Sequence, residues 1–147
     1  MKRRIFCQGA IATLAALPLP AMAAPVRATL FRNPQCNCCD IYADYLRENG
    51  FEVDVMSTND LAEINSKAGI PENIQGCHAM FIDSYVVDGL VPVNIVRKLL
   101  SERPAIAGIT LPGMPVGAPG MPGQKTAKLV VYAFTKDGKA PTIYATE

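Results

Sequence analysis

The sequence predicts one mixed α/β domain in the order strand, helix, strand, helix, strand, strand, helix, followed by two further strands. Short apolar runs alternate with segments in which apolar residues recur every three or four positions, as in helices. Gly and Pro stand at most borders between these segments. The chain has 147 residues, half of them apolar, which suits one hydrophobic core and leaves little room for a second.

The first half is expected to contain a strand over 26–32, a helix over 38–49, a strand over 51–55 and a second helix from Asp60 to just before Gly69. The first helix is indicated by Ile41, Tyr42, Tyr45 and Leu46, which are paired at spacings of three and four residues. Strict alternation of apolar and acidic residues marks the second strand. Asp60 and Glu63 have the spacing of a capping box, and Gly69 is a typical helix terminator.

The second half is expected to contain strands over 79–83 and 85–87, a helix that starts at Pro92 and stops at Pro104, a Gly/Pro-rich loop over 108–123, and strands over 128–134 and 141–145. This element order has a parallel start and an antiparallel finish, which is the thioredoxin-type arrangement. We therefore predict a thioredoxin-like βαβαββα domain with a Gly/Pro-rich loop and two extra C-terminal strands.

The N-terminus has the pattern of an export signal. A basic head, Met1 to Arg4, precedes an apolar run that Pro18 and Pro20 interrupt, and Ala21-Met22-Ala23 supplies a cleavage site. The run is too short to span a bilayer. We predict a signal peptide over 1–23, a single domain over 24–147 and a periplasmic location, reached by the Sec route rather than the twin-arginine route.

Charge and composition exclude several classes of partner. Cleavage removes three of the 14 basic side chains and none of the 13 acidic ones, which leaves a net charge of −2. Without a basic block, no nucleic-acid binding and no membrane anchor in the mature chain are expected. Cys7 leaves with the signal peptide, so four Cys remain in an oxidising compartment. Nothing in the sequence indicates an oligomeric state.

Three of these Cys stand together in Cys36-Asn37-Cys38-Cys39, between the first strand and the first helix. A helix N-terminus stabilises thiolates, the form needed for disulfide exchange and for binding soft metals. Cys36 and Cys39 form a C-x-x-C motif, and a redox motif needs only those two. The third thiol is surplus for redox chemistry but useful to a metal. Two structural disulfides explain this clustering of cysteines poorly. Bridges within the cluster would close only very short loops, which add the least stability.

Cys77-His78 precedes the third strand and, in a thioredoxin-type fold, faces the head of the first helix. Thiolate and imidazole bind Cu(I) and Zn(II), and a thiolate-rich set favours Cu(I). Met114 and Met121, in the Gly/Pro-rich segment, offer thioether ligands on a stiff backbone. An ordinary extended loop is the alternative explanation for that segment.

The segments CNCC, GCHAMFID, VDGLVPV and LPGMPVGAPGMPG, in this order behind an export signal, resemble the CopG-like copper-resistance proteins. The resemblance extends from the first strand through Gly123. It implies an exported thioredoxin-like protein with a copper site and a redox role in handling copper. By position, the implied ligands are Cys36, Cys38, Cys39, Cys77 and His78, with Met114 and Met121 less securely assigned.

We therefore expect a periplasmic copper-binding protein that holds one or more Cu(I) ions and takes part in copper resistance or homeostasis, with a coupled thiol redox step. Its expected partners are copper ions and other periplasmic copper-handling proteins. A metal-binding protein is favoured over an enzyme. The alternative is a thiol–disulfide oxidoreductase that uses Cys36 and Cys39. A third hypothesis is a binding module that is stabilised by two disulfides.

Overall fold

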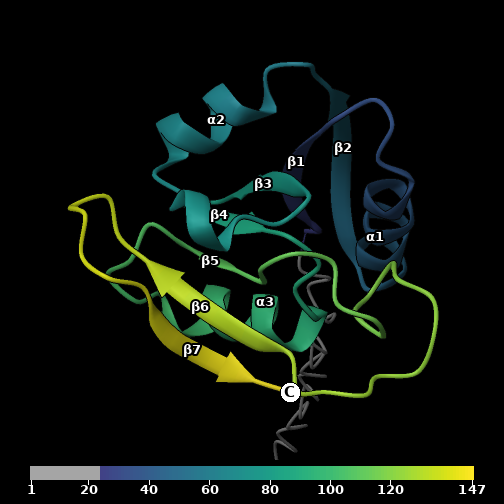
Figure 1. Cartoon of the computed structure of the whole chain (residues 1–147). Coiled ribbons are helices and arrows are strands. Elements are labelled where there is room, and N and C mark those ends of the chain that lie inside the picture. Colours follow the sequence, from purple (N-terminus) through teal and green to yellow (C-terminus); the bar gives the residue numbers. More distant parts are fainter. Residues whose placement is uncertain (1–23) are drawn as a thin grey trace, which may run out of the picture.

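The computed structural model describes residues 24–147 (Figure 1). The predicted signal peptide and Cys7 lie outside these residues. The described strands are β1 (Val26–Arg32), β2 (Phe51–Ser57), β3 (His78–Ile82), β4 (Tyr85–Asp88), β5 (Gly108–Thr110), β6 (Val130–Phe134) and β7 (Thr142–Thr146). The helices are α1 (Asn37–Glu48), α2 (Leu61–Ala68) and α3 (Val93–Glu102), with a 3₁₀ turn at Glu72–Ile74. None of these helices is long and apolar enough to cross a bilayer.

All seven strands form one sheet in the order β2-β1-β3-β4-β5-β6-β7. β1 pairs with β2 in parallel, whereas β3 is antiparallel to both β1 and β4. The predicted parallel start and antiparallel finish are therefore confirmed, and the chain is a mixed α/β protein. The finer assignment to the thioredoxin-like class stays a prediction.

The sheet separates two layers of helix. The buried faces of α1 and α3 pack with Leu30, Met80 and Val87 on one face of the sheet. On the opposite face α2 packs against a smaller apolar cluster that includes Val86 and Phe134. Residues alternate between the two faces along each strand, so neighbouring side chains at a strand end point to opposite sides of the sheet.

Three strands follow α3, not two. The predicted Gly/Pro-rich loop begins with β5, which pairs in parallel with β4 and antiparallel with β6. It thereby joins the last two strands to the main sheet. Gly-Ile-Thr is too short to show the alternation by which a strand is recognised in a sequence. The rest of the segment reaches the start of α1, where a Cβ added to Gly120 would lie 2.8 Å from the Cys38 carbonyl oxygen.

One helix cap was predicted wrongly, and one apolar residue with helical spacing is exposed. Ile41 is that exposed residue, because the inner face of α1 is formed by Cys39, Tyr42, Ala43 and Leu46. Asp60 precedes α2 without making a side-chain cap. Instead, the Thr58 hydroxyl accepts a hydrogen bond from the Asp60 backbone N–H at 3.0 Å. The helix itself lies where expected and ends at Gly69, which has φ +79°.

Candidate metal centre

The topology gathers four chain segments at one end of the sheet. β1, β4 and β5 end there, and β3, which is antiparallel to β1 and β4, begins there. The loop after β1 leads into the N-terminus of α1 at the same end. This end therefore carries the Cys36–Cys39 segment, Cys77-His78 and the beginning of the segment with Met114. Ligands commonly bind at such an edge of an α/β sheet.

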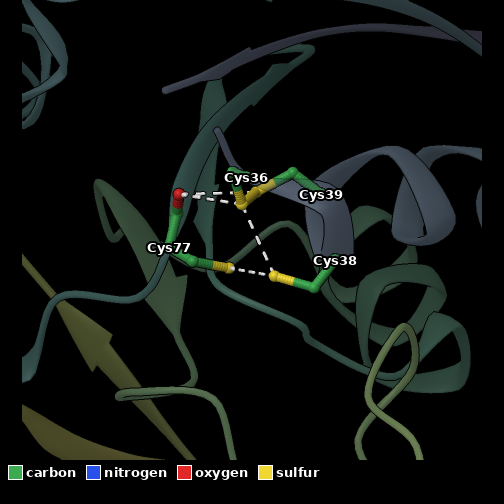
Figure 2. Close-up of side chains that lie close together, drawn as sticks. All are labelled: Cys36, Cys38, Cys39 and Cys77. Atoms are coloured by element: carbon green, nitrogen blue, oxygen red, sulfur yellow. Dashed lines mark hydrogen bonds between the residues drawn. A yellow bond between two sulfur atoms is a disulfide. The ribbon is translucent and has the colours of Figure 1, made fainter. Parts of the chain in front are cut away.

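The four cysteines of the described chain come together there. Their Sγ atoms lie within 4.8 Å of one another (Figure 2). Cys36 stands immediately before α1, and Cys39 is fully buried in its first turn. These two form a disulfide, whereas Cys38 and Cys77 are free thiols. Residues 24–147 thus contain one disulfide, whereas the hypothesis of a disulfide-stabilised binding module requires two.

Cys38 stands at the centre of the sulfur atoms. Its Sγ lies 3.4 Å from Cys36 Sγ, 3.7 Å from Cys77 Sγ and 3.7 Å from the Met114 thioether sulfur. A thiol has one proton, so Cys38 donates to only one of these three sulfurs at a time. These distances are short enough for the sulfur atoms to bind one soft metal ion in place of that single proton.

Cys77 faces the cluster with both its side chain and its backbone. Its carbonyl oxygen lies 3.5 Å from Cys39 Sγ (Figure 2). Burial raises the pKa of the Cys77 thiol, and the neighbouring Cys38 raises it further. Cys77 is therefore a protonated thiol at neutral pH in the metal-free protein. Binding a metal cation would release this proton, because the thiolate is the ligand.

His78 begins β3 and lies beneath Cys77. Its ring is fully buried and stacks on Tyr42 of α1, with ring centres 4.9 Å apart. Nδ1 lies 3.5 Å from Cys77 Sγ, whereas Nε2 is buried without a hydrogen-bond partner. Burial lowers the pKa of His78 to about 3, so the imidazole is neutral and able to donate a lone pair. His78 borders the four-sulfur group rather than lying inside it.

The two methionines of the Gly/Pro-rich segment line the same cavity. This open cavity has a volume of about 510 Å³ and lies over the cysteines. Its wall includes Cys36, Cys38, Cys77, Met114 and Met121. Met114 reaches Cys38, while Met121 is partly buried against the main core. The structure therefore brings all seven predicted side chains to one region, and their roles as ligands stay predictions.

Two charged side chains support the site and were not predicted. Arg32 donates hydrogen bonds to the carbonyl oxygens of Asn33 and Pro34, and its guanidinium forms an ion pair with Asp40 at 2.8 Å. These contacts tie the loop before Cys36 to α1. Asp88 is buried at the end of β4, close to Cys77. A carboxylate within an apolar strand sequence is the signal by which Asp88 could have been found.

Comparison with known proteins agrees with this geometry. Residues 74–121 match the family described as "Protein of unknown function, DUF411". No curated protein sequence matches the chain. Two solved chains, form 1 and form 2 of the copper resistance protein CopG, are each 33% identical to this chain with a TM-score of 0.77. Each alignment covers 84% of this chain and 98% of the solved chain. The chain therefore belongs to the family of the copper resistance protein CopG.

Proposed function

We propose that this protein binds Cu(I) through the Sγ atoms of Cys36, Cys38, Cys39 and Cys77, and serves copper resistance or homeostasis. The observation that carries the proposal is the approach of four sulfur atoms to within 4.8 Å of one another at a helix N-terminus. The likeness to a copper resistance protein supports copper as the metal.

The donor set fits a soft monovalent cation. Thiolate and thioether sulfur are soft ligands and select Cu(I). The N-terminus of α1 favours negative charge, so it offsets the cost of gathering thiolates. We assign His78, through Nδ1 beside Cys77, as a nitrogen ligand, and Met114 as a thioether ligand at the open side. Met121 is the remaining candidate, on the inner wall of the same cavity.

The disulfide limits how many ligands are available. With Cys36 and Cys39 joined, Cys38 and Cys77 are the free thiols of the site. Reduction by two electrons and two protons yields four thiols, a set large enough for more than one Cu(I) ion. In the opposite direction, forming the bridge from the Cys36 and Cys39 thiols supplies two electrons, which reduce two Cu(II) to two Cu(I), and releases two protons. Copper loading is thereby coupled to a thiol–disulfide step.

The cellular setting is part of the proposal. The export signal expected over 1–23 would deliver the domain, 24–147, to the periplasm, where copper and other copper-handling proteins would be its partners. A thioredoxin-like fold would suit this role, because such folds display a C-x-x-C motif at the head of α1, opposite the chain segment that here contains Cys77.

A competition titration tests the proposal. The protein is reduced, freed of reductant without oxygen, and titrated with Cu(I) against a chelator of known affinity. Tight binding is expected in the reduced protein. Weaker binding with lower stoichiometry is expected in the protein left oxidised and in the double variant Cys36→Ser plus Cys39→Ser. Weak binding by the reduced protein, or binding unchanged in the double variant, would overturn the copper proposal.

A thiol–disulfide oxidoreductase is the second candidate. The observation that favours it is the free Cys38 thiol, 3.4 Å from one sulfur of the Cys36–Cys39 disulfide. A thiolate at this distance is placed to attack Cys36 Sγ and expel Cys39 as a thiolate. An insulin-reduction assay and a dithiol-oxidation assay without copper decide the matter. Turnover in either would support this candidate, and no turnover in both would exclude it.

A further inference from the structure

Asp88 lies directly behind the backbone that carries Cys77. It is the last residue of β4 and is paired across the sheet with Ala79 of β3 and Thr110 of β5. Strand alternation places it on the face opposite His78, at the same end of the sheet. Asp88 is fully buried, which is rare for a carboxyl side chain unless it has a structural or chemical task.

Its carboxyl group holds the chain segment that leads to Cys77. Asp88 Oδ2 accepts a hydrogen bond from the Gly76 backbone N–H at 2.5 Å and lies 2.6 Å from the Thr110 hydroxyl oxygen. The Thr110 hydroxyl also lies 2.7 Å from the Ile74 carbonyl oxygen, to which it can donate. Asp88 and Thr110 together therefore fix two backbone groups, at residues 74 and 76.

The neighbouring residue of β4 holds the other side of Cys77. The Gly89 N–H donates to the His78 carbonyl oxygen at 3.2 Å. Cys77 is thus bracketed: Asp88 binds the residue before it, and Gly89 binds the residue after it. Space at this bracket is tight, because a Cβ on Gly76 would collide with the Gly89 backbone and lie 3.1 Å from Asp88 Oδ2.

The structure assigns Asp88 as the positioning residue of Cys77: its carboxyl group, with the Thr110 hydroxyl, fixes the backbone at Gly76 and so aims the Cys77 sulfur at Cys38. Outer-shell groups of this kind fix the orientation of a ligand before the metal arrives, and their loss commonly weakens metal binding 10- to 100-fold. A test by Cu(I) affinity rests on the proposed function, whereas a test by hydrogen exchange at the Gly76 amide does not.

Two substitutions at Asp88 test whether its hydrogen bonds, and not only the volume of its side chain, position Cys77. Asp88→Asn keeps both contacts when its amide oxygen stands at the Oδ2 position, because that oxygen accepts from the Gly76 N–H and from the Thr110 hydroxyl. Asp88→Ala removes both and leaves the partly buried Gly76 N–H without this partner. Thr110→Val removes only the hydroxyl and keeps the side-chain shape. Asp83→Asn, at the other end of the β3–β4 hairpin, is the matched control.

Two measurements on the whole protein decide the assignment. Hydrogen exchange at the Gly76 amide, followed by NMR in the copper-free protein, should speed up at least tenfold in Asp88→Ala and stay unchanged in Asp88→Asn and Asp83→Asn. Cu(I) affinity of the reduced protein, measured by chelator competition, should fall about 10- to 100-fold in Asp88→Ala and stay within about threefold in the two Asn variants. Thr110→Val should fall between them and serves alone if Asp88→Ala does not fold.

The outcomes separate this inference from the proposed function. If Asp88→Ala, or Thr110→Val in its place, leaves Gly76 exchange and Cu(I) affinity unchanged, Asp88 does not position Cys77. If Asp88→Asn loses as much as Asp88→Ala, a hydrogen-bonding oxygen at this position is not sufficient to position Cys77, and the inference is also wrong. If the parent protein fails to bind Cu(I), the proposed function falls, and Gly76 exchange alone decides the role of Asp88.

Discussion

The sulfur atoms of Cys38 and Cys77 lie 3.7 Å apart, although 39 positions separate the two residues in the chain. One belongs to the first turn of α1 and the other to the entry of β3, so the fold itself brings them together. Neither is part of the disulfide that joins Cys36 to Cys39. The site therefore contains one disulfide and, beside it, two free thiols.

This arrangement predicts which thiols react. Iodoacetamide without reductant should label Cys38 and Cys77 and leave Cys36 and Cys39 unlabelled. Cys77 should react more slowly than its exposure suggests, because burial and the nearby Cys38 raise the pKa of its thiol. Peptide mass spectrometry before and after mild reduction measures this. A bridge between Cys38 and Cys77, or labelling of Cys36 without reductant, would contradict the arrangement.

Met114 should contribute to copper binding through its thioether. Met114→Leu conserves side-chain size and removes the sulfur that lies 3.7 Å from Cys38 Sγ. We expect Cu(I) affinity to fall about tenfold, which corresponds to about 1.4 kcal/mol. Met56→Leu is a close control, because Met56 is 50% exposed and Met114 53% exposed, but Met56 lies on β2 away from the cavity lining. Equal affinities in the two variants would remove Met114 from the ligand set.

Asp88 should make stability depend on pH in a specific direction. Burial raises its pKa from 3.8 to about 7, although hydrogen bonds from Thr110 and Gly76 act in the opposite sense. Between about pH 4 and pH 7 the folded protein keeps this proton and the unfolded chain has lost it. The contribution of Asp88 to stability is therefore complete below pH 4 and is lost as pH rises through 7.

The comparison with Asp88→Asn isolates this effect. Burial lowers the pKa of His78 to about 3, so His78 acts in the opposite direction, but it is present in both proteins and cancels in their difference. The free energy of unfolding of the parent minus that of Asp88→Asn should fall as pH rises from 4 to 7, by at most about 1.4 kcal/mol per pH unit. Urea unfolding at several pH values measures it. A flat difference would show that the buried carboxyl has an ordinary pKa, and a difference that rises with pH would show a lowered pKa; either result would contradict this prediction.

Tyr42 should stabilise the fold beneath the metal centre. Its hydroxyl donates to the buried Val91 carbonyl oxygen at 2.8 Å, and its ring stacks on His78. Tyr42→Phe keeps the stacking and leaves a buried carbonyl oxygen without this donor, at a cost of about 1–2 kcal/mol. Tyr144→Phe is the control, because its hydrogen bond to Glu102 is at the surface and should be worth much less. Thermal unfolding of the two copper-free variants measures the difference. An equal loss of stability in Tyr42→Phe and Tyr144→Phe would contradict this role of Tyr42.

Much of the fold was predictable because its signals are local. Helix periodicity, Gly69 and Pro104 located α2 and α3 to within one or two residues. β5 was missed, because a three-residue strand buried between two others has no pattern of its own. Ile41 has the spacing of a helix but is exposed, and the sequence does not tell that the buried Cys39 belongs to the inner face of α1.

The candidate site divides in the same way. The sulfur residues were found because clustered Cys and a Cys-His pair are distinctive in sequence. Which two cysteines form the bridge depends on spatial approach, so the C-x-x-C spacing named a candidate pair without deciding between connectivities. The support from Asp88 and Thr110 depends on β4 lying beside β5. No local pattern revealed that pairing. The position of Asp88 at the end of an apolar strand did indicate that its carboxyl group has a specific role.

The most direct test of the copper proposal is a crystal structure of the reduced protein soaked with Cu(I). We expect copper bound between Cys38 Sγ and Cys77 Sγ, with the thiols of the reduced Cys36 and Cys39 completing the sulfur set. Copper bound elsewhere on the chain, or a reduced site whose four thiols remain free of copper, would contradict the copper proposal.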